Sequence, residues 1–292
     1  MSPRPGESWI SRSEAEASFQ TLRDRLAKTR RLLEDLGVRV PAASRFDDYG
    51  RELDRLTRIA IDQQMDLTSD ACQPLQDAIL ECQQFLPNVT ELAHPPEVAG
   101  WRAIAATAIR GHTSARSESG ATPGRDAQVE LYVAGLGRRA GYQVRFAEPD
   151  VILERAGEVP LAIAVKRVKT ADALAKRLRE GSTQLRRAGC AGVVAVQLGF
   201  FAKHVIRATE MDGALEIVRG EVRGFAARRM CELRRCVDLE WCYGLILLAS
   251  KPAFLGTGLA VVSSIYSCNL CGETDPRCPV LERLMERLPN EP

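Results

Sequence analysis

The fold is decided by two neighbouring stretches of the sequence. Residues 148–154 read Glu-Pro-Asp-Val-Ile-Leu-Glu, and residues 161–169 read Leu-Ala-Ile-Ala-Val-Lys-Arg-Val-Lys. Each contains a short apolar run rich in β-branched residues, and a turn-forming segment separates them, which predicts two β-strands joined by a tight connection. Asp150 opens the first strand and Lys166 lies late in the second.

Alternation along the second strand places Lys166 on the same face as Ala162 and Ala164. If the turn is centred near Glu158, Asp150 lies opposite Lys166, and Ile152 lies opposite Ala164. The sequence therefore predicts that a carboxylate and an ammonium group meet across this pair of strands.

The segments around this pair alternate between helical and extended patterns. A helix over 126–140 and a strand over 143–146 precede it, while a helix over 172–188 and a buried strand over 192–198 follow it. A long amphipathic helix over 211–239, strands over 243–248 and 259–266, and a short helix over 280–288 complete the pattern. This order predicts an α/β (α+β sandwich) domain with a mixed sheet, spanning 125–267.

The first third of the chain has helical periodicity throughout. We expect no regular structure in residues 1–12, helices over 13–36, 46–67, 69–86 and 101–110, and a polar linker over 111–124. Residues 1–110 therefore read as an all-helical module that dimerises the protein or binds a partner. Its cations are interleaved with acids, which favours a solvated face over a DNA contact (Arg23, Arg25, Lys28, Arg30, Arg31).

Composition limits the function classes. The formal net charge of +2 on 292 residues excludes a global polyanion-binding field, so nucleic-acid affinity must come from local basic patches. The N-terminus has no apolar run of signal-peptide length, and no segment approaches 18 apolar residues, so we expect a cytoplasmic protein without membrane spans. Most of the nine cysteines are then expected to be buried free thiols.

The central residues suit metal-assisted phosphodiester hydrolysis. Such hydrolysis needs a divalent ion that polarises the phosphate and activates a water, and Mg²⁺ prefers carboxylate oxygens. A nearby lysine orients the water and offsets negative charge. Asp150 and Lys166 provide one of each group, and Glu130 lies in the preceding helix.

Residues 125–198 resemble the PD-(D/E)XK, or restriction-endonuclease-like, superfamily. The resemblance rests on Glu130, on Pro149-Asp150, on Ala164-Val165-Lys166 at the place of the family's acid-x-lysine, and on Gln184 in the next helix. It implies a restriction-endonuclease-like fold and a metal-dependent nuclease that usually acts on DNA. The resemblance assigns Mg²⁺ or Mn²⁺ to Asp150 and Glu130, and the positioning or activation of water to Lys166.

Ala164 departs from the family, which has an acid at this position. In one interpretation the second acid comes from the following helix, where Glu180 has the spacing and Gln184 lies closer to the apolar stripe. In another, Glu130 and Asp150 alone hold the metal. In the third, the chain is a catalytically inactive relative that binds nucleic acid or scaffolds a complex.

The C-terminal tail, residues 268–292, contains three cysteines at zinc-like spacing. Cys268, Cys271 and Cys278 supply three thiolates for a structural Zn²⁺, with Cys242, Cys236 or a histidine as a fourth ligand. The alternative is a set of ordinary free or buried thiols. With zinc bound, the chain also fits a further interpretation, a zinc-stabilised interaction protein unrelated to nucleases.

Overall fold

The computed structural model describes most of the chain from Pro123 onward and parts of the first 110 residues. The described residues are 9–10, 12–42, 44, 47–51, 54, 65–66, 85, 87–110, 123–203, 206–255, 258–272 and 275–288. The predicted helix over 69–86 and the predicted linker over 111–124 lie almost entirely outside these ranges, and the last two linker residues belong to the helix Pro123–Arg139.

A mixed sheet forms the centre of the described structure. It contains β3 (Gln143–Ala147), β4 (Asp150–Glu154), β5 (Leu161–Val168), β6 (Gly192–Leu198), β7 (Ile206–Arg207), β8 (Cys242–Leu255) and β9 (Gly258–Asn269). Their order is β3-β4-β5-β6-β8-β7, and β9 pairs with β8. The β5–β6 and β6–β8 pairs are parallel, whereas the β3–β4, β4–β5 and β8–β9 pairs are antiparallel.

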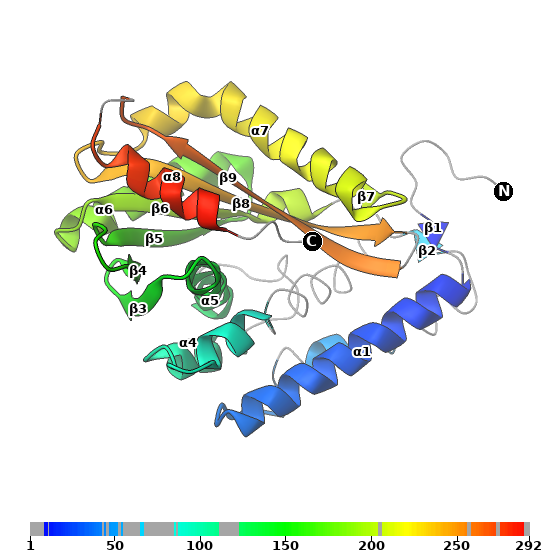
Figure 1. The fold of residues 1–292 in the computed structure, drawn as a ribbon. Coiled ribbons are helices and arrows are strands. Elements are labelled where there is room, and N and C mark those ends of the chain that lie inside the picture. The colour runs from blue at the N-terminus through cyan, green and yellow to red at the C-terminus, as the bar shows by residue number, and fades with distance from the viewer. Residues whose placement is uncertain are drawn as a thin grey trace.

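Helices cover both faces of this sheet (Figure 1). One face packs on α5 (Pro123–Arg139), α4 (Trp101–Ala108), α1 (Arg12–Asp35) and α8 (Cys278–Arg287), and the other packs on α6 (Leu174–Arg187) and α7 (Met211–Arg235). Because both faces are buried, the central strands are apolar at nearly every position, as β5 and β6 show. The expected α/β class with a mixed sheet is confirmed.

The strand pair that decides the fold has the expected faces but not the expected register. Ile163 packs on the α5 side of the sheet, and Ala162 and Ala164 pack on the α6 side. The predicted pairing of Ile152 with Ala164 is wrong, since Ile152 lies opposite Ala162 and Val151 lies opposite Ile163. The chain reverses around Gly157, whose φ of 80° suits glycine, one residue before the predicted centre. With the turn centre one residue earlier, the position opposite Asp150 on β5 is Ala164, two residues before Lys166.

The N-terminal third is not all-helical. Trp9–Ile10 and Met65–Asp66 form a small antiparallel ribbon of two strands, β1 and β2, so the predicted helix over 46–67 ends before Met65. The buried residues of α1 and α4, such as Leu33 and Trp101, belong to the same hydrophobic cluster as the α5 face of the sheet. The division into three domains stays a prediction.

The helices after the sheet's first half follow the predicted pattern. A short 3₁₀ turn (Ala171–Ala173) precedes α6, and a second (Gly199–Lys203) follows β6. Helix α7 ends at Arg235, four residues before the predicted end. No helix within the described ranges is long and apolar enough to cross a membrane.

Candidate functional site

Asp150 accepts hydrogen bonds on both of its carboxylate oxygens. It stands at the first position of β4 with its side chain 17% exposed. Oδ2 accepts from the backbone N–H of Val165 at 2.7 Å and from Nζ of Lys166 at 3.4 Å, and Oδ1 accepts from Nε2 of Gln184 at 2.8 Å. The register of the β4–β5 pair makes the Val165 contact, so the local fold itself fixes this carboxylate.

Lys166 uses all three of its donors within the protein. Its Nζ donates to Asp150 Oδ2, to the backbone oxygen of Val165 at 2.9 Å and to Oε1 of Gln184 at 2.5 Å. The side chain is 16% exposed. A largely buried ammonium group needs such acceptors to offset the loss of its hydration.

Gln184 joins the two residues from above the sheet. Helix α6 packs on β5 through Leu178 and Leu185, which directs Gln184 toward the start of β4. Its amide nitrogen also donates to the backbone oxygen of Pro149 and, at 3.3 Å, to Oε2 of Glu148. The structure therefore brings the predicted Asp150, Lys166 and Gln184 into one network, named here the Asp150 network.

Glu130 faces this network from α5 on the other side. Burial and, to a smaller extent, the negative charge of Asp150 raise the pKa of Glu130 to about 7, while Lys166 opposes the shift. Burial also raises the pKa of Asp150, against the effects of Lys166, Val165 and Gln184. A buried carboxyl group whose ionisation is disfavoured by a neighbouring carboxylate is a candidate for a cation-binding site.

Glu180 is held elsewhere. Its carboxylate pairs with Arg177 at 2.8 Å and with Lys176 at 3.9 Å, both on α6, and its side chain is 37% exposed. Its recorded contacts are therefore with cations of its own helix, one turn away from Gln184, and not with Asp150 or Glu130.

Two further acids lie near the site that the sequence interpretation did not select. Asp126 stands one turn before Glu130 on α5, which is the spacing that places two side chains on one helix face. Burial raises the pKa of Asp126, and the charges of Arg167, Arg177, Lys166 and Lys169 lower it in part. Glu148 contacts Gln184, as described above. The i,i+4 spacing of Asp126 and Glu130 was the sequence signal that could have identified Asp126.

Ala164 has no exposed surface. It packs in the cluster between the sheet and α6–α7, at 0% exposure. The place where the family has its second acid is thus part of the core, and the Gln184 carboxamide occupies the polar space next to Lys166.

The described cysteines of the tail lie on different sides of the core. Cys268 packs with the α6–α7 side of the core, whereas Cys271 packs with the other side. Burial raises the pKa of Cys268 to about 11 and that of Cys242 to about 12, which favours neutral thiols. Across the described part of the chain, no group of three or more His, Cys, Asp or Glu side chains is arranged to hold a metal ion. The zinc site stays a prediction.

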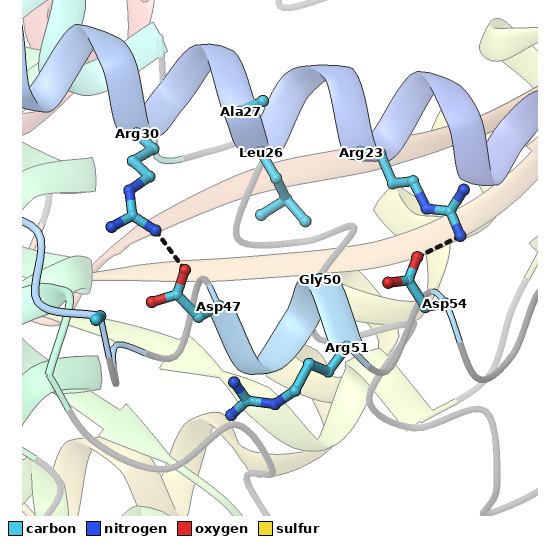
Figure 2. Close-up of a pocket in the computed structure, with 9 residues that line it drawn as sticks. Arg23, Leu26, Ala27, Arg30, Asp47, Gly50, Arg51 and Asp54 are labelled. Atoms are coloured by element: carbon cyan, nitrogen blue, oxygen red, sulfur yellow. Dashed lines mark hydrogen bonds and ion pairs between the residues drawn. The ribbon is translucent and has the colours of Figure 1, made fainter.

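A separate hollow of about 530 Å³ lies between α1 and the short helix around Asp47 (Figure 2). Arginines of α1 span it to reach aspartates on the other wall, in the pairs Arg30–Asp47 and Arg23–Asp54. Its lining includes none of the residues of the Asp150 network.

Comparison with known proteins returns no relatives for this chain: no family model, no curated protein and no solved structure matches it.

Proposed function

We propose that this protein is a divalent-metal-dependent nuclease with a restriction-endonuclease-like fold that hydrolyses phosphodiester bonds in DNA. The observation that carries the proposal is the Asp150 network together with Glu130. It combines, on adjacent strands and the helices that cover them, the two carboxylates, the lysine and the glutamine that the sequence resemblance singles out.

The donor set suits a Mg²⁺ or Mn²⁺ ion held by two carboxylates. Mg²⁺ commonly binds proteins through one or two carboxylates and keeps several waters. Asp150 and Glu130 would hold it, and a cation there would relieve the repulsion that raises the pKa of Glu130. Glu180 is not included, because Arg177 and Lys176 neutralise it. The bound ion would polarise the phosphate and lower the pKa of the attacking water.

The side chains of the network then have distinct tasks. Lys166 Nζ, now bonded to Asp150 and Gln184, would donate to a non-bridging phosphate oxygen and offset its developing charge. Gln184 would hold Lys166 and Asp150 in register from above the sheet. Water adds to phosphorus and loses a proton to solvent as one phosphorus–oxygen bond of the diester breaks, and the leaving oxygen takes up a proton from solvent.

The test is cleavage of supercoiled plasmid and of single-stranded DNA with Mg²⁺ or Mn²⁺, with RNA as a parallel substrate. Wild type is compared with Asp150→Ala, Lys166→Ala and Glu130→Gln. We expect each of the first two to lose at least about 100-fold in rate, the scale on which removing one charge-stabilising group acts. The matched control is Glu216→Gln, an exposed acid of α7 paired with Arg219. Equal cleavage by all variants would assign the activity to a contaminant or another site and reject the proposal.

A second candidate function is nucleic-acid binding without cleavage. Two observations favour it. All three donors of Lys166 already bond to acceptors within the protein. Ala164 is also fully buried. In this case wild type binds DNA in the presence of a chelator, and no metal supports cleavage.

A further inference from the structure

Positive charge is concentrated on two helices of the same layer. Helix α6 contains five cationic side chains and one acid, which gives +4, and residues 223–235 of α7 contain five arginines and one acid, which also gives +4. The whole chain carries only +2, so the remaining residues together carry −6. The molecule is therefore strongly polarised although its total charge is small.

These two segments lie side by side. Both pack on the same core cluster. One hydrogen bond links α7 to the 3₁₀ turn before α6, and another links the segment after α7 to α6. Arg229 Nη1 donates to the backbone oxygen of Ala171 at 2.9 Å, and the backbone N–H of Asp238 donates to Ser182 Oγ at 2.9 Å. We call their outer surface the α6–α7 face. Its exposed cations are Lys176, Arg179, Arg186, Arg187, Arg223, Arg228, Arg234 and Arg235.

Helix-end stabilisation accounts for some of this charge but not all of it. Arginines in the last turn of each helix interact favourably with the helix dipole (Arg186, Arg187, Arg234, Arg235). Arg179, Arg223 and Arg228 lie outside these last turns, so the dipole does not explain them. Counting the nearby acids Asp172 and Asp238 as well leaves a surplus of +6 on the face.

The α6–α7 face begins at the candidate site. Arg177, Gln184 and Arg187 are spaced by seven and three residues, which places them along one side of α6. Gln184 reaches Asp150 from this side, and the charge of Arg177 acts on Asp126. An elongated anion lying on the face would therefore reach the Asp150 network at one border.

We infer that the α6–α7 face binds the phosphate backbone of a nucleic acid and delivers it to the Asp150 network; this inference rests on the proposed function and names its binding surface. Regularly spaced phosphates match a broad cationic surface, because neutralising them releases counterions. A membrane surface fits less well, since interfacial helices need exposed apolar side chains. In the described residues the exposed large apolar side chains are Val159, in the β4–β5 turn, and Ile217, on α7 before residue 223, which is too few for an interfacial helix.

The test measures binding of a short fluorescent duplex DNA by anisotropy in the presence of a chelator, so that cleavage cannot contribute. The main variant is Arg179→Glu with Arg228→Glu, which avoids the last turns of the helices. We expect its affinity to fall at least about 10-fold and the salt dependence of binding to become shallower by about two phosphate contacts. A second variant, Arg186→Gln with Arg187→Gln, should weaken binding without reversing charge.

The matched control is Arg25→Glu with Lys28→Glu, which makes the same charge change at two exposed positions of α1. It should bind within about two-fold of wild type if the surface is specific. If the control and the main variant lose the same DNA affinity, the loss comes from net charge and not from a specific surface. If only the control loses DNA affinity, the binding surface lies on α1. Sedimentation with phosphatidylserine vesicles completes the test, because vesicle binding without DNA binding overturns the inference.

The outcomes separate this inference from the proposed function. Binding that depends on Arg179 and Arg228, with no cleavage under any metal, supports the surface and rejects the nuclease. Cleavage that needs Asp150 and Lys166, with binding and cleavage unaffected in the main variant, supports the nuclease and rejects the surface.

Discussion

Among the described carboxyl groups, Glu130 is the one whose ionisation the fold opposes most clearly. Its pKa of about 7 in the folded protein lies above the ordinary value of 4.5. Below pH 4.5 the group is protonated in both the folded and the unfolded chain. Between pH 4.5 and pH 7 the folded state keeps a proton that the unfolded state has lost, so the free energy of unfolding falls as the pH rises through this window.

Glu130→Gln should remove this pH dependence. Without metal, we expect the variant to gain on the order of 1–2 kcal/mol over wild type between pH 5 and pH 8, a figure reduced from the full shift because the group is partly solvated. Urea unfolding at both pH values measures it, with Glu216→Gln as the control. Parallel pH profiles for wild type and Glu130→Gln would contradict the raised pKa of Glu130.

Substitutions of Ala164 test whether this position, where the related family has an acid, is part of the hydrophobic core. An introduced carboxylate would have to enter a fully buried position, so Ala164→Glu should cost about 3 kcal/mol or more in the free energy of unfolding. Ala164→Ser, which adds one polar atom, should cost about 1–3 kcal/mol. Chemical denaturation measures both. A fully stable Ala164→Glu protein would show instead that the side chain reaches the Asp150 network.

At the scale of the elements, two glycines differ in the space around them, one being closely packed and the other open. A Cβ atom at Gly192, the first residue of β6, would overlap the backbone oxygen of Ala162 on the neighbouring strand. A Cβ atom at Gly220, within α7, meets no atom of another segment within 4 Å.

Gly192→Ala should therefore lower the free energy of unfolding by about 2–4 kcal/mol, because two paired strands must move apart. Gly220→Ala should raise it by about 0.5–1 kcal/mol, since alanine has the higher helix propensity. Denaturant unfolding of the two variants is the measurement. Similar losses in both would mean that α7 does not keep its helical conformation around Gly220.

The sequence predicted the strands of this core better than the register between them. The bounds of β5 and β6 were predicted correctly, because strands buried on both faces are nearly uninterrupted apolar runs. The register of β4 on β5 was wrong because a one-residue change in the turn centre moves a pairing by two positions. Such a shift keeps every side chain on its face, so alternation gives no warning of it.

The candidate site was predictable to the same extent. The sequence allowed the selection of Asp150, Lys166 and Gln184, because each lies at a defined place on β5 or on an element that contacts β5. Glu180 was equally plausible by spacing, but its ion pair with Arg177 depends on side-chain conformations that spacing does not encode. The two-residue strands β1 and β2 are too short to produce a periodic signal.

At the scale of the whole molecule, one carboxylate fastens the C-terminal helix to the central hairpin. Glu158, in the β4–β5 turn, pairs with Arg287 of α8 at 2.7 Å and with Arg283 at 3.6 Å. Arg287 also donates to the hydroxyl of Tyr142 at 2.9 Å. This contact holds α8 over the α5 side of the sheet, between segments more than a hundred residues apart.

Glu158→Gln should loosen α8 without unfolding the sheet, because it keeps the shape of the side chain and removes the charge that two arginines share. We expect faster amide hydrogen exchange in residues 278–287 and little change in β5 and β6. Glu154→Gln is the matched control, since Glu154 lies on the same hairpin and pairs with the exposed Arg145. Unchanged exchange in α8 would show that its apolar contacts alone hold it.

The carboxamide of Gln184 has a further consequence for the proposed site. Its nitrogen binds Asp150 where a cation would bind, and its oxygen accepts from Lys166 where a phosphate oxygen would accept. At the proposed site this carboxamide would compete with metal and substrate, and because it is tethered it would do so at a high effective concentration. Shortening it, as in Gln184→Ala, should strengthen apparent Mg²⁺ affinity while loosening the alignment of Lys166, so that occupancy and turnover change in opposite directions.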